Sequence, residues 1–103
     1  MTETVKVIIP AYNEEKSIGN VIRDLPSFVD EIIVVNNNST DATEKNAKEA
    51  GATVITELKP GYGNACLKGI EHIKQQEITT DIVVFLDGDY SDYPEELIKI
   101  ITP

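Results

Sequence analysis

Hydrophobic positions along the chain form two alternating patterns. Short runs of mainly β-branched residues are typical of buried strands. These runs lie at residues 5–9, 31–35, 52–56 and 81–86. Between them, hydrophobic residues recur at the i, i+3, i+4, i+7 spacing that places them on one face of a helix. The first such set is Ile18, Val21, Ile22 and Leu25. The chain is therefore predicted to alternate strands with helices.

Polar and helix-breaking residues indicate where the first two helices begin and end. We expect Asn13 to cap the first helix and Pro26 to end it. The second helix is expected to begin at Asp41, with Glu44 completing a capping box, and to stop at Gly51.

Two further helices are predicted in the second half of the chain. One follows the turn at 59–61, and His72 lies off its buried stripe, so His72 is expected at the surface. That stripe consists of Cys66, Gly69, Ile70 and Ile73. A last helix is predicted to begin at Pro94. Its hydrophobic residues are Leu97, Ile98 and Ile101.

Strands that are apolar throughout, alternating with helices, predict one α/β domain over residues 1–103. The expected architecture is a three-layer, Rossmann-like parallel sheet with helices on both faces. Because crossovers are right-handed, few arrangements remain, and we expect strand order 3-2-1-4. Ligands of such sheets bind beyond the carboxyl ends of the strands, where the strand order reverses. Loops 10–15 and 87–92 would then lie side by side.

The predicted strand at 81–86 raises a question about the edge of the sheet. Only one predicted helix follows it, so it would form an edge, although its residues are apolar toward both faces. An uncovered edge strand of this kind is unfavourable. We therefore expect either the N-terminal part of a larger, apparently truncated domain, or a homo-oligomer in which a second copy pairs with this edge.

Charge and composition narrow the classes of partner. Nine basic against 18 acidic residues give a net charge of −9, which argues against nucleic acid and anionic membrane surfaces. The single cysteine, Cys66, excludes an internal disulfide and fits a reducing compartment. We find neither a signal peptide nor an apolar stretch of the roughly 18 residues that a membrane span needs. A cytoplasmic location is expected, with membrane association left open for a longer parent.

An acidic cluster follows the fourth predicted strand. Asp87 and Asp89 flank Gly88, so their carboxylates can converge on one side of an extended loop and hold a hard cation such as Mg²⁺. The other interpretation is a polar turn, in which Asp92 caps the last helix. The position at the carboxyl end of a strand, beside the expected reversal of strand order, favours the metal site.

The loops after the first two strands have two interpretations each. In loop 10–15, Asn13 is a helix cap, or Tyr12 offers a stacking face while Asn13 and Glu14 hydrogen-bond a base or ribose. The asparagine-rich stretch 36–38 is a turn, or its amides read the edge of a nucleobase.

The glycine-rich stretch 59–69 precedes the third predicted helix. Its backbone amides could face a phosphate at the helix N-terminus, with Lys59 and Lys68 as candidate phosphate partners. It matches neither the dinucleotide-binding nor the P-loop fingerprint. Cys66 falls on the apolar stripe and is expected to be inert core.

Taken in order, four segments resemble a family 2 glycosyltransferase of the GT-A fold. The segments are VIIPAYNEEKSIGNVI, IIVVNNNSTDAT, KPGYGNACLKGI and VVFLDGDYSDYPEEL, the last containing a D-x-D motif. They are most similar to the polyprenyl-phosphate branch, which includes dolichyl-phosphate mannose synthase. Together they cover nearly the whole chain, and four matches in order are more specific than any one.

The resemblance implies a set of functional residues. Loop 10–14 would border the uridine or guanosine of a sugar nucleotide, the loop near Asn37 would help hold the base, and 59–64 would lie near the base and diphosphate. Asp87 and Asp89 would be catalytic, because they would position the donor and its Mg²⁺ or Mn²⁺. The residues implied to bind the nucleotide sugar are Pro10, Ala11, Tyr12, Asn13, Glu14, Asn37, Lys59, Gly63, Asn64, Asp87, Gly88 and Asp89.

The implied activity is inverting, metal-dependent transfer of a sugar from a UDP- or GDP-sugar to a polyprenyl phosphate or glycan acceptor. The family commonly has Asp where this chain has Asn36 and Asn37. A carboxylate general base for a hydroxyl acceptor would lie downstream, so the 103-residue chain alone is expected to be inactive. The alternative is a non-catalytic nucleotide-binding or assembly module of the same fold. A phospho-accepting receiver domain is disfavoured, because 59–61 has no Asp.

Overall fold

The computed structural model describes residues 4–76, 80–86 and 98–101. Within these ranges, strands and helices alternate as far as the fourth strand. The strands are β1 (Val5–Ala11), β2 (Glu31–Asn36), β3 (Thr53–Thr56), β4 (Ile82–Phe85) and β5 (Ile98–Ile101). The helices are α1 (Ile18–Arg23), α2 (Thr43–Glu49) and α3 (Tyr62–Lys74).

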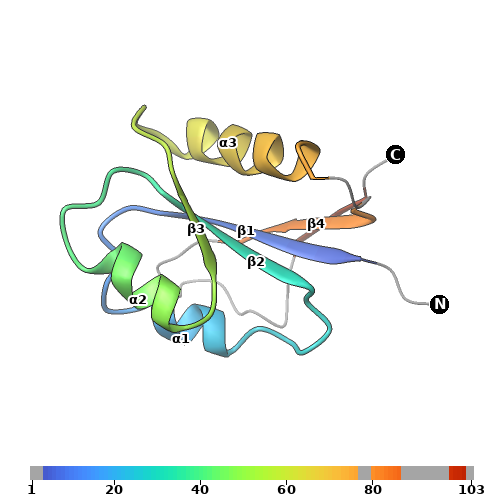
Figure 1. The fold of residues 1–103 in the computed structure, drawn as a ribbon, viewed down its shortest axis with the longest axis horizontal. Coiled ribbons are helices and arrows are strands. Elements are labelled where there is room, and N and C mark those ends of the chain that lie inside the picture. The colour runs from blue at the N-terminus through green and yellow to red at the C-terminus, as the bar shows by residue number, and fades with distance from the viewer. Residues whose placement is uncertain (1–3, 77–79, 87–97, 102–103) are drawn as a thin grey trace.

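The strands form one sheet in the order β3-β2-β1-β4-β5. The first four are parallel to their neighbours, and β5 is antiparallel to β4. Helices α1 and α2 cover one face of the sheet and α3 covers the other (Figure 1). The expected α/β fold, with three layers and strand order 3-2-1-4, is confirmed.

Alternate residues of β1 contribute to two cores. Val7 and Ile9, both fully buried, pack with the apolar residues of α1 and α2, whereas Ile8 packs on the α3 side. Gly69 brings α3 close to the sheet, because a Cβ at that position would lie 2.6 Å from the Ile8 Cγ2 atom. Each fully buried aliphatic side chain contributes about 1.5–3 kcal/mol to folding, so these layers hold the strand ends in fixed positions.

Register brings the carboxyl ends of the first three strands to one edge of the sheet. Ala11 pairs with Asn36, and Asn36 pairs with Thr56. Beside them, the backbone N–H of Leu86 donates to the Ile8 carbonyl at 3.1 Å, so β4 also leaves the sheet at this edge. The loops that follow all four parallel strands therefore begin close together.

The prediction of a last helix is wrong for residues 98–101. They form β5, in which Ile98 pairs with Phe85 and Ile101 with Ile82. The segment IKII is rich in β-branched residues, and pairing satisfies the backbone groups that β4 would otherwise expose. The expected open edge of the fourth strand, through which two copies would pair, is therefore also wrong. Pro94 and Leu97 lie outside the described residues.

The predicted start of the first helix is also wrong. Helix α1 begins at Ile18 with Ser17 at its N-cap, four residues after Asn13 by position. Asn13 has a φ of 52°, a left-handed conformation that asparagine tolerates better than most residues, so it turns the chain instead of capping a helix. The helix ends at Arg23, before Pro26.

The second helix follows the prediction more closely. Asp41 lies one residue before the N-cap Ala42, and its Oδ1 accepts the backbone N–H of Thr43 at 2.9 Å. The capping box is absent from this turn, because the Glu44 carboxylate accepts from Asn36 and pairs with Lys48 instead. Gly51 follows the helix with a φ of 101°, as a C-terminal glycine does.

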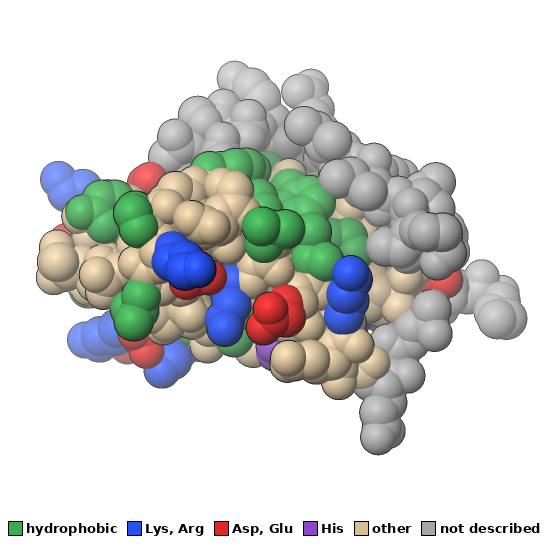
Figure 2. Space-filling model, turned by 90° about the horizontal axis from the view of Figure 1, so that it is seen from above, with side chains coloured by type: hydrophobic (Ala, Val, Ile, Leu, Met, Phe, Trp, Pro, Cys, Tyr) green, Lys and Arg blue, Asp and Glu red, His purple; other side chains and the backbone are tan. Residues whose placement is uncertain are grey.

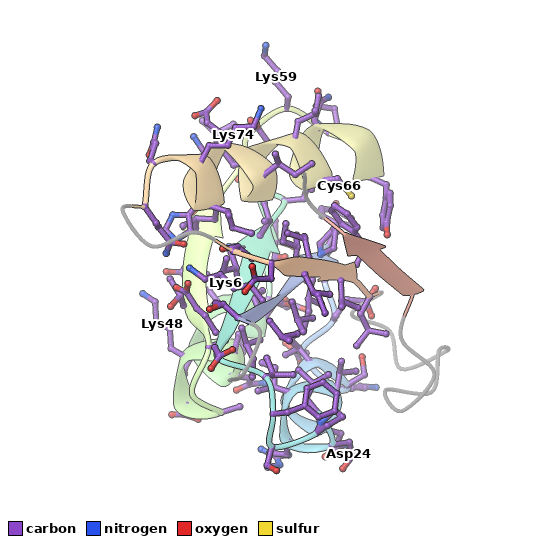
Figure 3. All side chains as sticks on the ribbon, turned by 90° about the vertical axis from the view of Figure 1, so that its right-hand side faces the viewer. Lys6, Asp24, Lys48, Lys59, Cys66 and Lys74 are labelled. Carbon is purple, nitrogen blue, oxygen red and sulfur yellow. The ribbon has the colours of Figure 1, made fainter. Side chains whose placement is uncertain are left out.

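Polar side chains form a cluster at the amino end of the sheet, under α3. The Lys6 side chain is only 7% exposed, and its Nζ lies 3.2 Å from Glu31 Oε1 and contacts Gln76 Oε1 (Figure 3). Gln76 Nε2 donates to Glu31 Oε1 at 2.9 Å, and Thr53 Oγ1 donates to Glu31 Oε2 at 3.2 Å. His72 Nε2 is buried, 3.8 Å from Glu31 Oε2, while 27% of the side chain is exposed, so the predicted surface histidine is only partly exposed. We call these residues the amino-end cluster.

None of the described helices is long and apolar enough to cross a membrane.

Candidate functional site

A pocket of about 660 Å³ opens at the carboxyl ends of β1, β2 and β3. Its walls come from the last two residues of β1, from the loops that follow these three strands and from the first residue of α3. The lining residues are Pro10, Ala11, Tyr12, Glu14, Asn37, Asn38, Thr40, Leu58, Pro60, Gly61 and Tyr62. This is the edge of the sheet at which a parallel α/β domain is expected to bind its ligand.

Side chains join the first loop to the second. The backbone N–H of Asn13 donates to Ser39 Oγ at 3.0 Å, and Asn13 Oδ1 accepts the backbone N–H of Thr40 at 2.9 Å. The next amide, that of Glu14, donates to Thr43 Oγ1 at 2.8 Å. Asn13 therefore fixes the walls of the pocket without lining it.

Acidic side chains add further hydrogen bonds between the first and second loops. Glu15 Oε1 accepts the backbone N–H of Ala42 at 3.0 Å, and Asp41 Oδ2 accepts the backbone N–H of Glu15 at 3.3 Å. Desolvation acts to raise the pKa of Asp41, but hydrogen bonds from the hydroxyl and the N–H of Thr43 outweigh it and lower that pKa. The folded loop therefore favours the ionised carboxylate of Asp41.

Asn37 joins the second loop to the third. Its Nδ2 donates to the carbonyls of Glu57 and Lys59 at 2.8 and 2.7 Å, and its Oδ1 accepts the backbone N–H of Gly61 at 3.0 Å. Asn64 holds the same loop from α3, because its Nδ2 donates to the Pro60 carbonyl at 2.9 Å.

Large apolar side chains are exposed around the pocket. Tyr12, Leu58 and Tyr62 are 58%, 70% and 53% exposed. Apolar surface gathered at a concave site, with a few polar groups among it, is typical of a small-molecule pocket. Aromatic rings stack well on flat, delocalised ligands, and Glu14, Asn38 and Thr40 supply polar groups beside them. The arrangement suits a planar ring that also forms hydrogen bonds.

Charge is mixed on the adjacent face of the molecule. Seen from the α3 side, Lys and Arg side chains stand between acidic and hydrophobic ones (Figure 2).

Helix α3 begins at the pocket, since Gly61 and Tyr62 line it. A helix N-terminus attracts anions, so a phosphorylated ligand can approach here despite the net charge of −9.

The predicted site residues divide into three groups. Pro10, Ala11, Tyr12, Glu14 and Asn37 line the pocket, and their binding of a nucleotide sugar stays a prediction. Asn13, Lys59, Gly63 and Asn64 do not line it, and the Lys59 side chain points away from the body of the molecule (Figure 3). Asp87, Gly88 and Asp89 lie outside the described residues. The assignment of these residues to donor and metal binding stays a prediction.

Sequence reasoning missed two lining residues, Thr40 and Leu58, and did not name four others individually. Asn38 lies in the asparagine-rich stretch considered for base reading, and Pro60, Gly61 and Tyr62 lie in the 59–64 region that the resemblance implies is near the base and diphosphate. The segment LKPGY could have predicted part of this lining. Its leucine and tyrosine flank a Pro-Gly turn and fit neither a helical nor a strand periodicity, so they are expected to be exposed. Within the described ranges, no group of three His, Cys, Asp or Glu side chains could hold a metal ion.

A Rossmann-like sheet with a pocket at its strand ends defines an α/β ligand-binding domain. Residues 6–103 match the model of glycosyl transferase family 2, so the chain belongs to this family of transferases. The expected family is thus confirmed, and with it the GT-A type of the fold.

Curated relatives match nearly the whole chain. An uncharacterized glycosyltransferase of Mycobacterium tuberculosis is 37% identical over 99 residues, which cover 96% of this chain and 43% of the relative. The UDP-N-acetylglucosamine–dolichyl-phosphate N-acetylglucosaminyltransferase of Methanococcus voltae is 33% identical over 118 residues, covering 96% of this chain and 46% of the relative. The chain spans less than half the length of these two relatives.

Solved structures of glucosyl-3-phosphoglycerate synthase from Mycobacterium tuberculosis share the fold. The complex with UDP is 35% identical, with a TM-score of 0.72 over 84% of this chain and 34% of that protein. The complex with Mn²⁺, UDP-glucose and phosphoglyceric acid is also 35% identical, with a TM-score of 0.71 over 84% of this chain and 33% of that protein. A further complex of the same synthase contains Mg²⁺ and UDP.

Proposed function

We propose that this chain is the nucleotide-sugar-binding part of an inverting glycosyltransferase that uses a UDP-sugar. The observation that carries the proposal is the pocket at the ends of β1, β2 and β3, in which Tyr12, Leu58 and Tyr62 are exposed. UDP is favoured over GDP because solved relatives of the same fold contain UDP or UDP-glucose.

The pocket residues suggest how the donor is held. Tyr12 and Tyr62 stack on the base, and Glu14, Asn38 and Thr40 hydrogen-bond the base or ribose. The diphosphate lies toward the N-terminus of α3, where backbone amides and the helix dipole favour negative charge. Stacking and anion binding together orient the sugar toward the edge of the sheet where β4 ends.

Asp87 and Asp89 would hold Mg²⁺ or Mn²⁺ at that edge. Two carboxylates suit either hard cation, and the chain leaves β4 at Leu86, one residue before Asp87, beside β1 and the pocket. When bound, such an ion stabilises the negative charge that develops on the departing nucleoside diphosphate. The described residues contribute the base and diphosphate contacts and exclude water from the base.

The acceptor is proposed to be a polyprenyl phosphate or a glycan. The relative from Methanococcus voltae is named for a dolichyl-phosphate acceptor. A phosphate oxygen is already deprotonated and needs no general base, whereas a glycan hydroxyl needs one. The carboxylate that lines the pocket, that of Glu14, is assigned here to the base or ribose. The lipid phosphate is therefore the simpler acceptor for this site. A cytoplasmic location stays a prediction.

Calorimetric titration with UDP and with GDP, each with and without Mn²⁺, tests this function. We expect UDP to bind more tightly than GDP, with an affinity that Mn²⁺ raises. The double variant Asp87→Asn/Asp89→Asn should lose the Mn²⁺ dependence and keep the weaker, metal-independent binding of the base. A folded chain that binds neither nucleotide would contradict the proposal. UDP binding without any turnover by the natural full-length protein would favour the non-catalytic nucleotide-binding module.

A further inference from the structure

The contacts that join the first pocket loop to the second differ from those that join the second to the third. Several side chains of both loops join the first loop to the second, through Asn13, Ser39, Asp41 and Thr43 among others. The second and third loops are joined in the sheet by the N–H of Glu57, which donates to the Asn36 carbonyl at 3.0 Å. Beyond that bond, Asn37 provides the side-chain contacts between them within the described residues.

The contacts of Asn37 require an amide. An amide side chain has two N–H donors and one carbonyl acceptor, and all three functions are used, toward Glu57, Lys59 and Gly61. An aspartate would place an acceptor-only carboxylate against the carbonyls of Glu57 and Lys59. Both N–H donors of the amide are therefore committed to the backbone of the third loop, and only the second lone pair of Oδ1 is left for a ligand.

The third loop carries an entire wall of the pocket. Leu58, Pro60 and Gly61 line the pocket, and Tyr62 follows them. Gly61 has a φ of 114°, so the chain makes a left-handed turn at the residue whose N–H Asn37 accepts. Holding this turn sets how far Leu58 and Tyr62 stand from Tyr12 on the opposite wall.

We propose that Asn37 is a positioning residue that fixes loop 57–61 and so sets the width of the pocket. Its effect on nucleotide affinity rests on the proposed function, whereas its effect on the loop does not.

The variant Asn37→Asp tests this proposal through its pH dependence. Hydrogen-exchange protection factors of the amides in 57–61, and UDP affinity, are measured between pH 3.5 and pH 8, a range that extends below the ordinary aspartate pKa of about 3.9. At pH 8 the carboxylate repels two carbonyls, so protection and affinity should each fall about tenfold, as expected for losing hydrogen bonds of ordinary strength. Below the pKa of the new carboxyl group, the protonated acid regains one donor, so both should partly recover. The wild-type loop should show the same protection factors at each pH.

Two further variants separate this role from charge and from folding. Asn38→Asp adds the same charge one residue on, at an exposed side chain, and should leave the protection of 57–61 at the wild-type level at every pH. Asn37→Ala removes all three hydrogen bonds without adding charge and should lower protection equally at pH 3.5 and pH 8. Urea denaturation verifies that each variant is folded.

The outcomes distinguish this inference from the proposed function. Wild-type protection of 57–61 in Asn37→Asp and Asn37→Ala would overturn the role of Asn37, even if UDP binds. Loss of protection with the predicted pH dependence would support that role, even if no form of the chain binds UDP, a result that would count against the proposed function alone.

Discussion

The two ends of the sheet use polar side chains in opposite ways. In the amino-end cluster, Lys6, Glu31 and Gln76 bond to one another, so their charges and donors are consumed within the cluster. At the carboxyl end, Asn13 and Asn37 bond mainly to the backbone of neighbouring loops. The first arrangement closes one end of the sheet, and the second joins neighbouring loops in fixed positions around a pocket of about 660 Å³.

This difference indicates which end of the sheet has side chains available to bind a ligand. Side chains that satisfy each other stabilise the fold but leave little to offer a ligand. Side chains that satisfy loop backbone keep the loops in place, and other residues on those loops then remain exposed, as Tyr12 and Tyr62 do at 58% and 53%. Changes at the amino end should therefore alter stability, and changes at the carboxyl end should alter binding.

Lys6→Met should produce the largest effect on stability. Removing one partner of a buried ion pair leaves the other charge uncompensated, and because the Glu31 side chain is 24% exposed we expect a loss of about 2 kcal/mol instead of the larger cost of a fully buried pair. UDP affinity should not change, since the cluster is at the far end of the sheet.

Urea denaturation measures this loss, and Lys48→Met is the matched control. Lys48 also pairs with a glutamate, Glu44, but both side chains are about half exposed at 58% and 47%. Solvent screens exposed pairs and leaves them little net stabilisation, so Lys48→Met should leave the urea midpoint close to the wild-type value. Equal losses in the two variants would contradict a structural role for the amino-end cluster.

Tyr12→Ala should have the next largest effect, on binding alone. A base stacked on an aromatic ring gains about 1–3 kcal/mol, so UDP affinity should fall about 5- to 150-fold. Stability should change by less than about 0.5 kcal/mol, because the ring is exposed. Phe28→Ala is the control, since Phe28 is equally exposed, at 57%, but precedes β2 at the amino end. Calorimetry that gives the same affinity for both variants would exclude Tyr12 from the site.

Acid should weaken the amino-end cluster through Glu31, with the smallest effect of the three. Desolvation acts to raise the pKa of Glu31, but hydrogen bonds from Gln76 and Lys6 and the charge of Lys6 outweigh it and lower that pKa. A lowered carboxyl pKa contributes stability above the ordinary glutamate pKa, and this contribution is lost as the pH falls through the folded value.

Comparison with Glu31→Gln isolates this contribution. The wild type should be more stable than the variant at pH 6, and the difference in urea midpoint should narrow as the pH falls to 3. A difference that stays constant over this range would show that Glu31 does not contribute through its charge. The pKa values of Asp41 and Glu44 are also lowered, so both forms should lose stability together in acid.

The sheet could be predicted from the sequence because its signals are local. Apolar runs such as 5–9 and 31–35 are buried wherever they pair, and short right-handed connections leave few strand orders. The error at 98–101 has a related cause. Ile98 and Ile101 fit the spacing of a helix, and only the unpaired backbone of β4 decides in favour of a strand.

The site was less predictable because its side chains depend on distant backbone. Asn37 follows a strand as a ligand-reading residue would, yet its partners are carbonyls 20 and 22 residues along the chain. The burial of Lys6 likewise depends on Gln76, 70 residues away. Tyr12 and Glu14 were predicted to be in the site because the segment that carries them resembles the family's first strand and loop, and both line the pocket.

A two-dimensional ¹⁵N–¹H NMR titration of the chain with UDP tests the central claim most directly. The account predicts that shifted amides gather in three loops, at 11–14, 37–40 and 58–62, while those of Lys6, Glu31 and Gln76 stay in place. Shifts at the amino-end cluster, or shifts scattered over the sheet without the three loops, would contradict a nucleotide site at the carboxyl ends of β1, β2 and β3.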